Sequence, residues 1–140
     1  MGAWSHASFG NDDAIDFAAD VAETNDLSRV ESAFDAVLAA GDDDLEAPEA
    51  SQAVAAAEVV ARLQRHWGVR NADSESIDAW IERTGITPPR DIVHKARQAL
   101  DRIVCEPSEL LELWQESEDG DKWRDAVREL RARLDGAPAR

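Results

Sequence analysis

Residues 48–67 read PEASQAVAAAEVVARLQRHW, and this stretch decides the fold. Pro48 suits the first turn of a helix, and Gly68 favours the end of one. With a rotation of about 100° per residue, the apolar side chains from Val54 through Leu63 occupy a sector of roughly 260° around the helix axis. The remaining polar strip contains Ser51, Glu58, Arg62 and Arg65. A helix with so wide an apolar surface belongs at the centre of a domain.

Helical spacing of apolar residues recurs on both sides of this stretch, and the alternation typical of strands is missing. We therefore expect an all-α fold, a single compact domain of about seven helices around a buried third helix. The other six predicted helices cover residues 12–22, 27–40, 74–83, 88–105, 109–116 and 122–134. Within a single domain over residues 1–140, we expect an N-terminal segment at 1–10, an acidic loop at 41–48 and a frayed tail at 136–140.

The charge is distributed unevenly along the chain. The net charge is −15, and residues 1–60 contain 14 Asp and Glu against one Arg. Such a field repels phosphate backbones and anionic lipid, but it attracts cations and basic protein surfaces. We therefore expect no nucleic-acid and no membrane partner, and we consider a basic protein as the partner. The alternative is that the charge only keeps the domain soluble.

The cellular setting is suggested by two absences in the sequence. Cys105 is the single cysteine, so the chain can neither close an internal disulfide nor supply a cysteine-based zinc site. No basic stretch followed by an apolar run opens the chain, and no window approaches the roughly 18 apolar residues of a membrane span. These patterns favour a cytoplasmic protein, and we expect no cofactor.

The densest group of carboxylates opens the first predicted helix, with Asp12, Asp13, Asp16 and Asp20. Positions 12, 16 and 20 stand four apart and share one helical face. Such a face can bind a hard cation, which makes Asp12 and Asp16 weak metal candidates, although oxygen ligands normally converge from more than one segment. The alternative is a solvated helix start, in which Asp12 and Asp13 interact favourably with the helix dipole.

Glu58 lies in the sequence AVAAAEVVARL at 53–63. Burial there would raise its pKa and make it a candidate general base. Arg62 follows four residues later on the same polar strip, so we favour an exposed helical ion pair between the two side chains.

Other suggestive residues carry less weight. His94 and Cys105, with Asp101, are the residue types of a nucleophilic triad, but about 16 Å of helix separates the first two, whereas a nucleophile and its base must come within about 3 Å. We identify no catalytic residues and favour a non-enzymatic protein. Three arginines of the last predicted helix share a stripe, and we expect them to face water or to pair with acidic residues of the chain rather than with phosphate. They are Arg124, Arg128 and Arg131.

Tryptophans are frequent in this tyrosine-free chain. Trp80, Trp114 and Trp123 fall at apolar helical positions, so we expect them in the core. Trp4 precedes the first predicted helix; it either tucks under the bundle, which we favour, or is presented to a partner.

Several segments resemble the bacterial family called domain of unknown function 4259. They are MGAW at 1–4, F-x-NDDAIDF at 9–17, LEAPEASQAVAAAEVVA at 45–61, ALDRIV at 99–104 and SELLELW at 108–114. Ser5 and Gln115 depart from the pattern, which has glycine and often an acidic residue there. The resemblance implies one domain of this length and no established activity, cofactor or partner. Its motif falls on Gly2, Ala3, Trp4, Asn11, Asp12, Ala14, Asp16, Glu58, Leu113 and Trp114.

The leading hypothesis is a non-enzymatic interaction domain whose acidic N-terminal face binds a basic partner, as an immunity protein or an inhibitor of a small toxin would. One alternative is a metal-binding or metal-dependent hydrolase-like domain that uses Asp12, Asp16 and Glu58. Another is a structural module without a ligand. The candidate binding residues are Trp4, Asn11, Asp12, Asp13, Asp16, Asp20 and Glu58.

Overall fold

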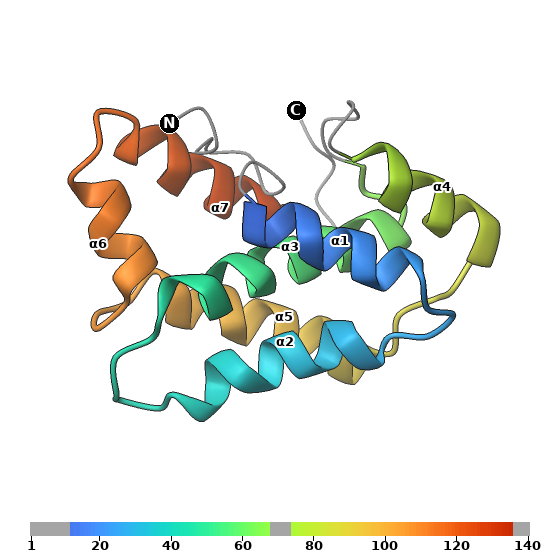
Figure 1. Cartoon of the computed structure of the whole chain (residues 1–140), viewed down its shortest axis with the longest axis horizontal. Coiled ribbons are helices and arrows are strands. Elements are labelled where there is room, and N and C mark those ends of the chain that lie inside the picture. The colour runs from blue at the N-terminus through green and yellow to red at the C-terminus, as the bar shows by residue number, and fades with distance from the viewer. Residues whose placement is uncertain (1–11, 68–73, 136–140) are drawn as a thin grey trace.

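The alanine-rich stretch forms helix α3, Ala47–Leu63, at the centre of the computed structural model, which describes residues 12–67 and 74–135 (Figure 1). Within these residues the structure contains seven helices and no named strand, so the predicted all-α fold is confirmed. The other six helices are α1 (Asp12–Ala22), α2 (Ser28–Ala39), α4 (Glu75–Thr84), α5 (Arg90–Ile103), α6 (Glu109–Gln115) and α7 (Gly120–Leu134). The predicted N-terminal segment and tail lie outside the described residues.

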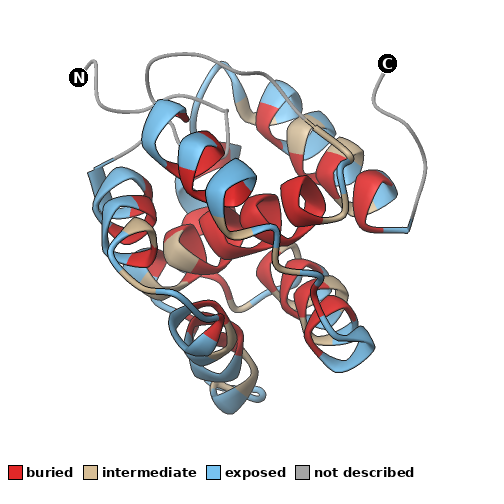
Figure 2. Ribbon diagram, turned by 90° about the vertical axis from the view of Figure 1, so that its right-hand side faces the viewer, coloured by how far each residue is buried: buried red, intermediate tan, exposed pale blue. Residues whose placement is uncertain are grey.

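Burial confirms the central position of α3. Fourteen of its 17 residues are buried, and it packs against all six other helices. Its many alanines allow neighbouring helices to approach closely, because a methyl side chain takes little space between two helix axes. In Figure 2 the buried residues gather in the interior, whereas the outer helices are buried on one side only. Figure 1 shows α4 and α6 at opposite ends of the molecule.

The end of α3 differs from the sequence-based prediction. The helix was expected to reach about Trp67, but it stops at Leu63. Arg65 adopts a left-handed φ of 69°. The amide of Arg65 then donates to the carbonyl of Arg62 at 2.9 Å, and the amide of His66 donates to that of Ala61 at 3.0 Å. This pair of bonds terminates a helix, and glycine usually occupies the left-handed position. With arginine there, the pattern gave no stop signal.

The tryptophans expected in the core are buried there. Trp80, Trp114 and Trp123 are all less than 7% exposed. The rings of Trp114 and Trp123 stack between α6 and α7, with their centroids 6.1 Å apart and their planes 5° from parallel. The indole of Trp80 donates a hydrogen bond to the carbonyl of Thr24 at 2.7 Å, which attaches α4 to the turn between α1 and α2. None of the described helices has both the length and the apolar character that a membrane crossing requires.

The acidic loop between α2 and α3 is attached to α5 by Arg102. Its guanidinium donates to the carbonyls of Gly41 at 2.9 Å and Asp43 at 2.7 Å, and also to those of Cys105 and Pro107, each at 2.8 Å. Next to it, Leu45 pairs with Ser108 in an isolated parallel bridge. The backbone that presents the three successive aspartates Asp42–Asp44 is therefore fixed at both ends.

Replacing Arg102 with alanine is expected to lower the free energy of unfolding by about 1–3 kcal/mol, because four carbonyls lose a charged donor. Urea denaturation measures this loss, and amide hydrogen exchange of residues 41–46 should accelerate. Lysine should restore less than half of the stability, because a single ammonium group cannot reproduce the guanidinium fork. Arg90→Ala, an exposed arginine on the same helix, is the control and should change little. Unchanged exchange in the loop of the Arg102→Ala variant would contradict this account.

Candidate functional site

The carboxylates of α1 face solvent. Ala14, Phe17, Ala18 and Val21 form the buried stripe of this helix, and the spacing of three and four residues turns the aspartates outward. Asp12, Asp13, Asp16 and Asp20 are all exposed. Among residues 12–67 and 74–135, no ion pair or side-chain hydrogen bond engages these four carboxylates. They are thus available charges, in agreement with the prediction of a solvated acidic face.

An open groove runs between α1 and α2, both of which pack on α3. It has a volume of about 410 Å³. Asp13, Asp16 and Asp20 line its α1 side, and the buried side chains of Phe17 and Ala33 form its floor. The remaining lining residues are Ser28, Arg29, Ser32, Ala36 and Gln52. Three of the four acidic candidates on α1 thus border one concave surface, with one arginine opposite them.

Glu58 lies in a different environment, a buried ion-pair network where α3, α4 and α7 meet. One carboxylate oxygen accepts from Arg62 Nε at 2.7 Å and from Arg133 Nη1 at 2.7 Å, and the other oxygen accepts from Arg133 Nη2 at 2.7 Å. The side chains of Glu58, Arg62 and Arg133 are each 3% exposed. The carboxylate thus makes a bidentate contact with one guanidinium and a single contact with another.

The network extends on both sides of Glu58. Arg62 Nη1 also donates to Asp78 at 2.6 Å, and the hydroxyl of Ser74 donates to the other oxygen of Asp78 at 2.8 Å. Arg133 Nε donates to Glu129 at 2.7 Å, and its Nη1 donates to the carbonyl of His66 at 3.0 Å. Each buried charge therefore has a partner of the opposite sign.

The predicted pair of Glu58 with Arg62 is confirmed, but its predicted exposure is wrong. The spacing of four residues identified the partner correctly. Glu58 and Arg62 do not face water, however, because Arg133 of α7 and Asp78 of α4 cover them. The exposed interpretation assumed that polar side chains on a helix mark its solvent face.

Protonation also separates Glu58 from the role of general base. Burial acts to raise the pKa of Glu58, but the hydrogen bonds and charge of Arg133 and the charge of Arg62 outweigh it, so that the pKa is lowered. The same contacts raise the pKa of Arg133 against its own desolvation. A carboxylate that is bound to two guanidinium groups, and whose own pKa is lowered, is a weak proton acceptor.

This shift gives a prediction for acid stability. A group whose pKa is lowered on folding stabilises the fold fully above its unfolded pKa, about 4.3 for glutamate, and this stabilisation is lost as the pH falls through the folded pKa. The free energy of unfolding, measured by urea denaturation, should therefore fall steadily as the pH drops below about 4. The fall should be shallower in a Glu58→Gln variant; an identical slope would contradict the assignment.

The structure separates Glu58 from the acidic candidates on α1. Trp4 and Asn11 lie outside the described residues. Glu58 does not join Asp12 and Asp16 in one ligand set, because both of its oxygens bind arginine. Within residues 12–67 and 74–135, no group of three or more His, Cys, Asp and Glu side chains is placed to hold a metal ion. A metal site that includes Glu58 is therefore disfavoured by the contacts of that carboxylate.

Sequence reasoning missed two arginines that organise the structure, Arg102 and Arg133. Arg102 binds the carbonyl of Asp43, and Arg133 binds Glu58; these groups are 59 and 75 residues away, so no helical spacing indicates them. Glu129 does lie four residues before Arg133, but that spacing indicates only a pair within the helix and not the buried contact with Glu58. The arginine stripe of α7 was interpreted more successfully. Arg128 pairs with Asp125 at 3.0 Å, and Arg131 pairs with Asp101 at 2.8 Å. Both arginines thus pair with acidic residues of the chain, which lie on α7 and α5 rather than on the acidic N-terminal helices.

Comparison with protein-family models adds an assignment without an activity. Residues 2–126 match a family described as a domain of unknown function, DUF4259. Comparison with curated proteins and with solved structures gave no match. The family match includes α1 to α6 and the first part of α7, so it contains Glu58, Arg62 and the acidic face of α1 but not Arg133. By this match over most of its length, the chain belongs to the family of the domain of unknown function 4259.

Proposed function

We propose that this protein is a non-enzymatic interaction domain that binds a basic protein through the acidic side of the α1–α2 groove. The observation that carries the proposal is the contrast between two sets of carboxylates. Glu31 and Asp35 on α2 are already paired with Lys95, at 2.7 and 2.9 Å. Asp13, Asp16 and Asp20 line the groove, and no basic side chain in the part of the chain that the structure describes is paired with them.

Unpaired carboxylates of this kind favour association with a basic surface in two ways. They steer a positively charged partner during the diffusional encounter, and they form charged contacts at the rim of the interface. Because these carboxylates are exposed, they stay hydrated until the partner contacts them. At physiological ionic strength, salt screens their attraction beyond about 8–10 Å. The single cysteine of the chain supports action in the reducing cytoplasm.

The test uses the full chain immobilised as bait for basic proteins from a cell extract, at about 50 mM and about 500 mM salt. The charge-removal variant is Asp13→Asn, Asp16→Asn and Asp20→Asn combined. We expect a basic protein that is retained at low salt, released at high salt and lost with this variant.

The matched control removes three exposed acidic side chains on and just after α6, none of which lines the groove, in Glu112→Gln, Glu116→Gln and Glu118→Gln combined. It has the same net charge as the groove variant, so it should retain the partner. If no protein is recovered at low salt, or if both triple variants retain the partner equally, the proposal is wrong.

A further inference from the structure

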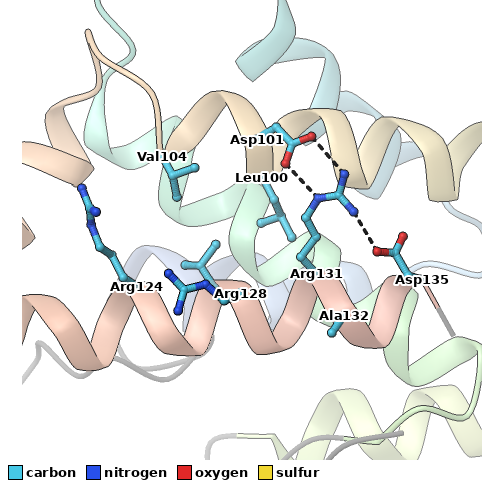
Figure 3. Close-up of a pocket in the computed structure, with 9 residues that line it drawn as sticks. Leu100, Asp101, Val104, Arg124, Arg128, Arg131, Ala132 and Asp135 are labelled. Carbon is cyan, nitrogen blue, oxygen red and sulfur yellow. Dashed lines mark hydrogen bonds and ion pairs between the residues drawn. The ribbon is translucent and has the colours of Figure 1, made fainter. Parts of the chain in front are cut away.

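A second groove lies between α5 and α7, and its chemistry is opposite to that of the acidic groove (Figure 3). It has a volume of about 420 Å³. Its apolar lining comes from Leu100 and Val127, which are buried, and from Val104, which is half-buried. Arg124, Arg128 and Arg131 border it along α7. An apolar surface bordered by a few charged groups is the usual composition of a small-ligand site, and the volume is within the usual range.

One end of this groove is spanned by an ion pair. Arg131 reaches from α7 to Asp101 of α5, with two bonds of 2.8 and 3.1 Å, and it also binds Asp135 at 2.9 Å (Figure 3). Asp135 receives a second arginine, Arg97, at 3.2 Å. The carboxylates that line the groove are therefore neutralised, and the bidentate contact between the helices limits how far a ligand can extend.

At the other end of the groove, the positive charges of Arg124 and Arg128 are available to a ligand. Arg124 has no side-chain hydrogen bond or ion pair among the described residues. Arg128 contacts Asp125, but both side chains are more than 70% exposed, and an ion pair so exposed contributes little stability. The two arginines are four residues apart and therefore adjacent on one helical face. Together they can hold one anionic group at the edge of the apolar lining.

We propose that the α5–α7 groove binds a medium-chain aliphatic carboxylate. Its carboxylate lies between Arg124 and Arg128, and its chain lies over Val127, Leu100 and Val104 toward the Arg131–Asp101 pair. Seven residues of helix separate Arg124 from Arg131, which is about 10 Å and accommodates a chain of about eight carbon atoms. The two guanidinium groups select a carboxylate over a neutral alcohol, and the apolar lining selects it over a small inorganic anion.

The net charge of −15 does not prevent this. Charges more than about 8–10 Å from the groove are largely screened at physiological salt, so the nearest arginines dominate the local field. The acidic groove lies between α1 and α2, two helices that do not line this one. The inference is thus independent of the proposed basic partner.

The experiment titrates the full chain with octanoate at pH 7 and follows its amide resonances by NMR. Octanol, octylamine and inorganic phosphate are the comparison probes. Octanoate should bind saturably and shift the resonances of Leu100, Val104 and Val127. The other three probes should bind at least about tenfold more weakly, because each lacks either the negative charge or the apolar chain.

Three variants localise the site. Arg124→Ala should weaken octanoate binding several-fold, and Val104→Asp, with its fold checked by circular dichroism, should abolish it. Arg90→Ala removes an equal charge at the N-terminus of α5 and should leave the affinity unchanged. No saturable binding of octanoate, equal binding of octanol, or equal affinity in Arg124→Ala and Arg90→Ala would each overturn the proposal.

Discussion

Replacing Glu58 with glutamine is expected to lower the free energy of unfolding by about 3–5 kcal/mol, the largest effect of a single polar substitution in this chain. The amide keeps the shape of the side chain but removes its charge. Arg62 and Arg133 would then share a buried site with Asp78 and Glu129 as the remaining carboxylates, and Glu129 is 42% exposed. Desolvation of the two guanidinium groups would no longer be offset.

Urea denaturation at pH 7 measures this effect. The matched control is Glu129→Gln, which removes the other carboxylate bound to Arg133. Its expected loss is below about 1 kcal/mol, because that carboxylate is partly exposed to water. If the two substitutions lowered the free energy of unfolding by equally small amounts, burial of the network would not determine its contribution to stability, and the prediction would be wrong.

Replacing Trp80 with alanine is expected to lower the free energy of unfolding by about 3–5 kcal/mol. Trp80 is 1% exposed and is the largest fully buried side chain. Its removal opens a cavity between α4 and the helices beneath it, and it also leaves the carbonyl of Thr24 without the indole donor. Thermal unfolding followed by circular dichroism should show a lower midpoint, with the helical signal retained at low temperature.

Trp80→Phe separates the two parts of this effect. Phenylalanine keeps most of the apolar volume but cannot donate to Thr24, so the expected loss is about 1–3 kcal/mol. A loss in Trp80→Ala no greater than that in Trp80→Phe would show that packing contributes little and would contradict the prediction.

The helix pattern was readable because local signals set most helix ends. Ser108 directly precedes α6, a position that favours serine, and its hydroxyl accepts a hydrogen bond from the amide of Leu111 at 3.4 Å. Gly85 directly follows α4, and it adopts the left-handed φ of 59° that glycine tolerates best. Arg65 shows the limit of these signals, since it takes the same conformation without glycine.

The faces of the helices were less predictable than their ends. Spacing alone allows Ile15 to share the core with Phe17 and Val21, but Ile15 is 37% exposed. Ala14 and Ala18 occupy the inward positions instead. An alanine next to α3 permits closer packing than isoleucine would. Which of these residues faces inward is decided by the arrangement of three helices in space, and helical spacing alone does not specify that arrangement.

The candidate site divides in the same way. The acidic face of α1 follows from composition and helical spacing, so the sequence predicted it. The second arginine on Glu58 did not follow, because Arg133 is 75 residues away and becomes a neighbour only after α7 packs on α3. The two grooves are likewise products of packing, since each is lined by side chains from separate helices.

The buried network also affects which parts of this protein can unfold locally. Glu58 joins α3 to the last turn of α7, and Arg62 joins α3 to α4. Fraying of the end of α7 would remove Arg133 from Glu58 and leave a buried charge without this partner. Partial opening there is therefore expected to cost nearly as much free energy as complete unfolding. We therefore expect amides of residues 127–134 to exchange their hydrogens only through global unfolding. α7 should thus be part of the most slowly exchanging unit.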